Sequence, residues 1–279
     1  MEFRVDGLRK RAAWIWVPRA LLAFLCLVPV YWIVNVSLSS PEALYKVPLD
    51  YFPRPPVGDN FEAVFETGQF PRNILNSFVV ATLTTLVALA LGAPAAYALA
   101  RLKVRRKNLI LALFLGIAIF PAIGMVGPLY VAMARLHLIN RYPALVLPYA
   151  LLNLPLAVWI LTQFFSTLPS SLEDAALVDG CTPVQALLRV ILPLSAPGLF
   201  TAAVLIFIFA WNEFLFALIL TSRPESRTVP VALGLFAGLH ALPWGTIAAA
   251  TVISVVPVLV LVVFFQRRIV EGLVSGAVK

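Results

Sequence analysis

Residues Asn73–Ala100 read NILNSFVVATLTTLVALALGAPAAYALA and include no Asp, Glu, Lys or Arg. A helix that crosses a membrane needs about 20 mostly apolar residues, because the hydrocarbon core is about 30 Å thick and a helix rises about 1.5 Å per residue. This stretch is therefore long enough to cross a bilayer as one helix. Other uncharged windows of similar length occur along the chain, which indicates a protein that crosses the membrane several times.

The composition of the chain points the same way. Of its 279 residues, 61% are hydrophobic and only 12% are charged, and the mean hydropathy is +0.95. A soluble domain usually carries about a quarter charged residues. These values exclude a disordered chain, a secreted disulfide scaffold and most cytosolic enzymes. The two cysteines, Cys26 and Cys181, lie far apart and predict neither a disulfide framework nor a metal site.

Six uncharged windows can each hold one span, so the sequence predicts an all-α polytopic membrane protein with six transmembrane helices. We place the spans at residues 20–38, 76–99, 109–133, 143–164, 199–220 and 244–265. Several prolines fall inside them and favour kinks, which lipid tolerates where neighbouring helices or a water-lined cavity satisfy the freed carbonyls. Such breaks favour a transporter, although kinks also occur in passive packing.

The basic residues predict the orientation of the spans. With both termini cytoplasmic, 14 of the 21 basic residues fall inside and seven fall outside. Residues 1–19 are then a cytoplasmic N-terminal segment and residues 266–279 a cytoplasmic C-terminal tail. Topology alone explains the basic clusters at 9–11 and 101–107, so binding of nucleic acid or of anionic lipid is the weaker interpretation.

The cytoplasmic loop 165–198, between the fourth and fifth spans, is predicted to form two short helices. Two capping-box patterns mark where they begin: Ser170 with Glu173, and Thr182 with Gln185. Gly180 suits a left-handed end for the first helix, and Pro193 is expected to force a break before the fifth span. Two capped helices form a rigid projection, which suits a docking site for another protein, but an ordinary amphipathic surface loop remains open.

The same loop carries a longer pattern, Asp174-Ala175-Ala176-x3-Gly180-x9-Val190-x-Leu192-Pro193. It closely resembles the E-A-A-x3-G-x9-I-x-L-P loop of permease subunits in binding-protein-dependent ABC importers. Asp174 stands for the usual Glu and Val190 for the usual Ile. Residues 207–214 look like the W-N-E-F segment of carbohydrate-uptake permeases. Asn76-Ser77, residues 96–101 and the tail from Gln266 are similar to the smaller permease of the maltose/trehalose type.

This resemblance implies that residues 20–279 form a permease domain of the ABC type I importer fold, in a bacterial or archaeal cytoplasmic (inner) membrane. A second permease subunit, two copies of a cytoplasmic P-loop ATPase and an extracytoplasmic sugar-binding protein are the implied partners. The implied function is ATP-driven import of a di- or oligosaccharide such as maltose or trehalose; the sequence does not identify the sugar. The outside segment Ser39–Arg72 is expected to meet the binding protein or simply to cover the spans.

By resemblance, the loop couples the permease to the ATPase. The residues assigned to this role are Glu173, Asp174, Ala175, Ala176, Asp179, Gly180, Leu192 and Pro193. The chain itself is not expected to be an enzyme, because a P-loop needs Gly-Lys followed by Ser or Thr and none of its five lysines fits. No cofactor is therefore expected in this chain, and ATP and Mg²⁺ belong on the partner ATPase. His137 and His240 are isolated and predict no metal site.

Trp211, Asn212 and Glu213 are the candidate substrate pathway. A carboxylate within a span is rare and usually faces the protein interior or a cavity. Trp211 can stack on a sugar ring, while Asn212 and Glu213 can accept protons from sugar hydroxyls. Two alternatives stay open: the three residues pack a permease interface or cap the outer end of the span, or the chain is a stand-alone secondary transporter with Glu213 as its proton or cation site.

Overall fold

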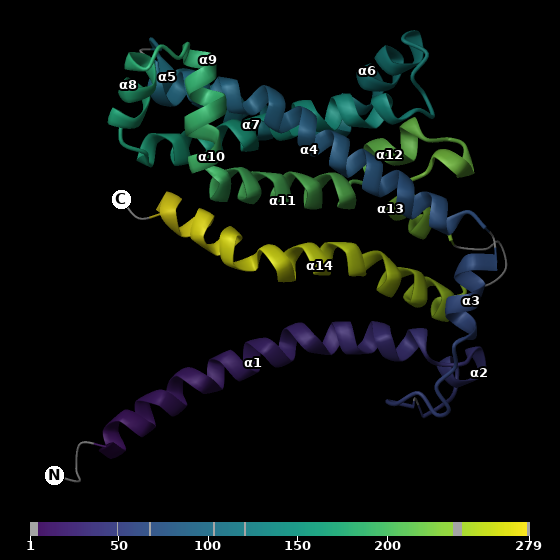
Figure 1. The fold of residues 1–279 in the computed structure, drawn as a ribbon. Coiled ribbons are helices and arrows are strands. Elements are labelled where there is room, and N and C mark those ends of the chain that lie inside the picture. Colours follow the sequence, from purple (N-terminus) through teal and green to yellow (C-terminus); the bar gives the residue numbers. More distant parts are fainter. Residues whose placement is uncertain are drawn as a thin grey trace. The chain divides into compact units, whose positions relative to one another are not determined.

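The structure is a computed structural model that describes residues 5–48, 50–66, 68–102, 104–119, 121–236 and 242–277 (Figure 1). His240, residues 1–4 and residues 278–279 lie outside the described residues. Within these ranges all regular secondary structure is helical, as predicted. The chain forms two compact units, Met1–Thr67 with Leu235–Val255 and Gly68–Gly234 with Val256–Lys279.

The first unit is organised around Asn60. Its buried amide donates to the carbonyls of Ser37 (3.1 Å) and Ser39 (2.8 Å), where a long first helix ends. A Cβ added to Gly245 would lie 2.3 Å from Asn60 Oδ1, so only glycine lets the last helix begin this close. The helices of the unit are α1 (Val5–Ser37), α2 (Pro41–Leu44), α3 (Asp59–Glu66) and the first turns of α14 (Trp244–Ala277).

Three helices form the core of the second unit: α4 (Phe70–Arg101), α7 (Tyr142–Thr167) and α11 (Ala196–Asn212). They lie side by side (Figure 1). Small residues allow their close approach, since a Cβ added to Gly92 would lie 2.9 Å from Ala157 Cβ. Buried Tyr149 and Val80 belong to the apolar cluster that fills the space between α4, α7 and α11.

Some of the predicted spans are single long helices, and others are interrupted. Four helices of the described residues are long and apolar enough to cross a membrane, at 16–37, 70–101, 142–167 and 244–266. The region predicted as one span at 109–133 instead contains two shorter helices, α5 (Lys107–Ile119) and α6 (Ala122–Arg135), on either side of Pro121. Proline supplies no N–H for an intrahelical bond, which explains why the helix does not continue there. The count of six spans stays a prediction.

The fifth predicted span, 199–220, is also interrupted. α11 ends at Asn212 and α12 (Leu215–Leu220) follows after a break at Glu213 and Phe214. At its other end, α11 is bent by 82° from the preceding helical residues 183–194. The chain then continues through η2 (Pro224–Ser226) and α13 (Val229–Gly234).

Candidate functional site

The loop between α7 and α11 folds into two helical segments, as the sequence predicts. The first is α8 (Ser171–Val178); the second runs through α9 (Pro183–Ala186), the π-helical η1 (Leu187–Ile191) and α10 (Leu192–Leu194). Gly180 ends the first segment at a φ of +86°, a conformation that most side chains disfavour. The second segment begins with the predicted capping box, in which Thr182 Oγ1 accepts from Gln185 N (3.3 Å) and Gln185 Oε1 accepts from Thr182 N (2.9 Å).

The other predicted capping box, Ser170 with Glu173, is wrong. Ser170 has helical backbone angles and makes no side-chain cap. Glu173 turns instead to the end of α4, where the Tyr97 hydroxyl donates to its carboxylate and the Arg101 Nε lies 3.8 Å away. The carboxylate of Glu173 is thus engaged by Tyr97 and Arg101 and not by the backbone at the start of α8.

We call Tyr97, Arg101 and Glu173 the Glu173 clamp. Arg101 also donates a hydrogen bond from its guanidinium to the Leu168 carbonyl at 2.7 Å, which ties the clamp to the end of α7. The side chains of Arg101 and Glu173 are only 9% and 14% exposed, so water screens their ion pair weakly. The clamp therefore fixes α8 to the C-terminal end of a spanning helix.

The eight residues predicted to form the coupling surface divide into two groups. Three face inward: Glu173 lies in the clamp, Ala176 is buried, and Leu192 packs beside a cluster that joins the loop to α4 and α7. The other five residues are exposed. They lie on α8, in the turn after it and on α10: Asp174, Ala175, Asp179, Gly180 and Pro193. The loop thus has a packed inner side and an exposed side that carries two carboxylates.

The Trp211-Asn212-Glu213 group lies at the break after α11. Trp211 is 3% exposed and its ring stacks on Phe207, with 5.8 Å between centroids. The Asn212 side chain is exposed, and its amide donates to the Ile208 carbonyl at 2.8 Å. Only one of these two neighbouring side chains therefore reaches the surface of the chain.

The Glu213 carboxylate holds the start of α12. Its oxygens accept from the backbone N–H groups of Phe216 (2.9 Å) and Ala217 (3.1 Å), and the Tyr149 hydroxyl donates to the same group. A new helix start leaves N–H groups without partners, and lipid supplies no water to satisfy them. Glu213 therefore caps a helix that starts within the predicted span 199–220 and not the outer end of that span. The role of the group in substrate passage stays a prediction.

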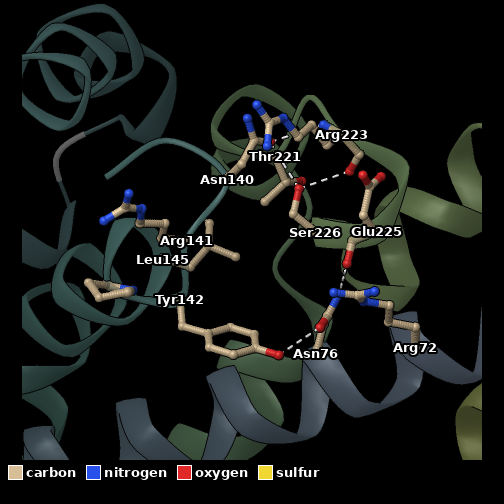
Figure 2. A pocket seen from close by; sticks show the side chains of 11 residues that line it. Arg72, Asn76, Asn140, Arg141, Tyr142, Leu145, Thr221, Arg223, Glu225 and Ser226 are labelled. Carbon is tan, nitrogen blue, oxygen red and sulfur yellow. Dashed lines mark hydrogen bonds between the residues drawn. The ribbon is translucent and has the colours of Figure 1, made fainter. Parts of the chain in front are cut away.

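A polar network at the other end of α4 was not predicted from the sequence (Figure 2). The Asn76 amide donates to the carbonyls of Glu225 and Arg227, both at 2.9 Å, and accepts from the Tyr142 hydroxyl at 2.9 Å. The Ser77 hydroxyl accepts from Val229 N at 2.8 Å. The available signal was the Asn-Ser pair within an uncharged window, which marks side chains that need polar partners.

Comparison with known proteins assigns the chain to a class. Residues 88–274 match the family described as "Binding-protein-dependent transport system inner membrane component". The chain is 42% identical to the trehalose/maltose transport system permease protein MalG of Thermococcus litoralis, over 93% of this chain and 94% of that protein. It is 43% identical to the sulfoquinovosyl glycerol transport system permease protein SmoH of Agrobacterium fabrum, over 91% and 89% of the two chains.

Solved structures share the fold. A chain in the crystal structure of a bacterial ABC transporter involved in the import of the acidic polysaccharide alginate aligns with a TM-score of 0.80 and 22% identity, covering 96% of this chain and 99% of that one. A chain from the alginate transporter in complex with an alginate pentasaccharide-bound periplasmic protein aligns with a TM-score of 0.67 and 16% identity, covering 96% of both chains.

The protein is therefore a multi-pass component of a membrane transport system. Within that class, it belongs to the family of inner membrane components of binding-protein-dependent transport systems, and it is an ABC importer permease. This assignment does not support a stand-alone secondary transporter.

Replacing Glu213 tests whether its carboxylate holds α12. We expect Glu213→Ala to lower the thermal unfolding midpoint of the purified protein in detergent, because two N–H groups and the Tyr149 hydroxyl lose their acceptor. Each buried polar group left without a partner costs about 1–3 kcal/mol. Asn212→Ala is the matched control, since it removes one bond from an exposed neighbour. Equal midpoints for Glu213→Ala and Asn212→Ala would contradict the capping role.

Replacing Glu173 tests the clamp. In Glu173→Ala, hydrogen exchange at residues 171–179 is expected to accelerate about tenfold or more, because hydrogen bonds to a charged group contribute about 1.5–3 kcal/mol. Ser171→Ala changes an exposed side chain of the same helix and serves as the control. If both variants exchange at the wild-type rate, the clamp does not hold α8.

Proposed function

We propose that the chain forms the translocation pathway of an ATP-driven sugar importer together with a second permease subunit. The observation that carries this proposal is the two-helix loop, which presents an acidic exposed side and is held to α4 by the Glu173 clamp. The relatives named for trehalose, maltose and sulfoquinovosyl glycerol transport favour a sugar or glycoside as the cargo. A di- or oligosaccharide such as maltose or trehalose is the class that we propose.

We also propose six spans with both termini cytoplasmic, in the inner membrane of a bacterium or archaeon. In this topology the loop with α8 is cytoplasmic, on the same side as the basic residues 101–107. The excess of Lys and Arg on that side supports the orientation. The α6–α7 turn and the segment after α12 then lie on the outer side, where an external binding protein delivers the cargo.

Coupling is proposed to pass through α8. A cytoplasmic ATPase is proposed to bind α8 on the side that exposes Asp174 and Asp179. The loop that contains α8 is attached to the spans at two places. One attachment is the Glu173 clamp to α4, and the other is the packing of Leu187 and Ile191 against α4 and α7. Because both attachments are stiff, displacement of α8 moves α4 and α7 with it.

The ATPase is a separate subunit in this proposal, present in two copies with its own ATP and Mg²⁺, since no lysine of this chain stands in a P-loop. Trp211, Asn212 and Glu213 keep a proposed place along the sugar pathway. Asn212 is the member whose exposed side chain can reach a sugar, and Trp211 and Glu213 would position it.

The composition of the native complex tests the proposal. Affinity purification of the tagged protein in mild detergent is expected to recover a P-loop ATPase and a second permease. Any captured external protein can be denatured and its bound sugar identified by mass spectrometry. Recovery of this chain alone, under conditions that keep other membrane complexes intact, would contradict the proposal.

Gly180→Leu tests coupling through α8. Gly180 has a positive φ of +86°, and an added Cβ meets no atom within 4 Å, so the expected effect of the substitution is strain in the backbone. The strain for a non-glycine residue is about 1–2 kcal/mol. We expect Gly180→Leu to assemble but to lose sugar-stimulated ATPase activity, measured in proteoliposomes with the binding protein.

Gly180→Asn is the control, because asparagine adopts the left-handed conformation more readily and should keep most of the activity. Wild-type stimulation in Gly180→Leu would show that this turn is not needed for coupling.

A further inference from the structure

A pocket of approximately 390 Å³ opens at one end of the second unit (Figure 2). Three separate segments line it: the first turns of α4, the turn between α6 and α7, and the stretch from the end of α12 through η2. Each segment contributes one arginine: Arg72, Arg141 and Arg223. Glu225 is the one acidic residue of the lining, so the side chains around this space carry a net positive charge.

The neutral polar groups of the lining are already used by the fold. The Asn76 side chain donates to the carbonyls of Glu225 and Arg227 and accepts from the Tyr142 hydroxyl. Asn140 Oδ1 accepts from the Ser226 hydroxyl (2.9 Å) and from Arg223 N (3.0 Å), and its own backbone is left-handed at a φ of 63°. These groups brace the three segments and leave few donors and acceptors for the hydroxyls of a neutral sugar.

The arginine side chains are different. Among the side chains that the structure describes, ion pairs within 4.0 Å join Lys46 to Asp50 and Arg101 to Glu173. Arg72, Arg141 and Arg223 are exposed, and they surround the pocket from different sides (Figure 2). Free guanidiniums bind carboxylates in bidentate geometry, which suits an anionic ligand.

The position of these arginines is unusual for a membrane protein. In the proposed topology seven basic residues lie on the outer side, where the positive-inside rule disfavours them. Three of the seven line this one pocket, and a fourth, Arg227, adjoins it through the bond from Asn76 to its carbonyl. Topology does not explain this gathering of charge, whereas an anionic ligand arriving from outside does.

We propose that this pocket receives a carboxylate side chain of the external sugar-binding protein when that protein docks. The inference rests on the proposed function, which supplies the orientation and the partner. Sites for small ligands bury about 70–90% of the ligand surface, whereas these guanidiniums are exposed around an open pocket. Exposed charges of this kind chiefly raise the rate of association and set the partner's orientation.

The test measures binding of the external protein recovered with the native complex, purified and sugar-loaded, to the complete transporter. The transporter is held in nanodiscs of zwitterionic phosphatidylcholine, so anionic lipid headgroups cannot contribute. The test variant combines Arg72→Gln, Arg141→Gln and Arg223→Gln. The control combines Lys46→Gln, Arg54→Gln and Arg135→Gln, which removes the same charge from exposed outer-side residues that do not line the pocket.

We expect the association rate of the test variant to fall about tenfold at low salt and to depend less on salt, with a much smaller change in the dissociation rate. The control variant should associate close to the wild-type rate. Equal losses in the two variants would show a general charge effect and would overturn the inference. So would wild-type association by the test variant.

Three further outcomes are informative. Competition by millimolar citrate at constant ionic strength, in the wild type but not in the test variant, would make this a site for small soluble acids and would overturn the assignment to a protein carboxylate. A wild-type transporter that binds no external protein and shows no sugar-stimulated ATPase activity would overturn the proposed function, and this inference with it. Normal stimulation with unchanged association in the test variant would overturn the inference alone.

Discussion

Every break in a membrane helix leaves backbone groups that lipid cannot satisfy, and this constraint shapes the structure. The chain meets it with polar side chains placed at its breaks. The buried Asn60 amide donates to two carbonyls where α1 ends. Asn76 and Ser77 hold the segment before α13, and Glu213 caps α12. These side chains allow an irregular backbone within an apolar fold.

Polar side chains satisfy partners at both ends of α4, but with different chemistry. At one end, Asn76 braces segments against each other through neutral bonds that require no change in charge. At the other end, Arg101 and Tyr97 hold the carboxylate of a loop helix. The Asn76 network consists of neutral hydrogen bonds, whereas the Glu173 clamp includes an ion pair, whose attraction falls off only slowly with distance. In the proposed coupling route, this charged contact is the one that joins α8 to α4.

The sequence predicts the features of this fold that depend on local rules. The helical class, the spans near 76–99 and 143–164, the left-handed end at Gly180 and the Thr182 capping box all follow from composition or from residues close together in the chain. The Ser170 box fails because Tyr97 and Arg101, far away in sequence, compete for Glu173. The break at Glu213 is missed for a similar reason, since periodicity does not show where a carboxylate will cap a helix.

The outer-side arginines show what a rule based on local sequence does not predict. The positive-inside rule treats each Lys and Arg as a topological marker and is indifferent to its neighbours. Arg72, Arg141 and Arg223 are outer-side residues under that rule, drawn from segments far apart in sequence, and only the fold brings them around one pocket. Their bracing by Asn76 and Asn140 fixes the segments that carry them, so the positions of the arginine backbones are set before any partner arrives. Preorganisation of this kind reduces the ordering cost of binding, which lets exposed charges act on the rate of encounter.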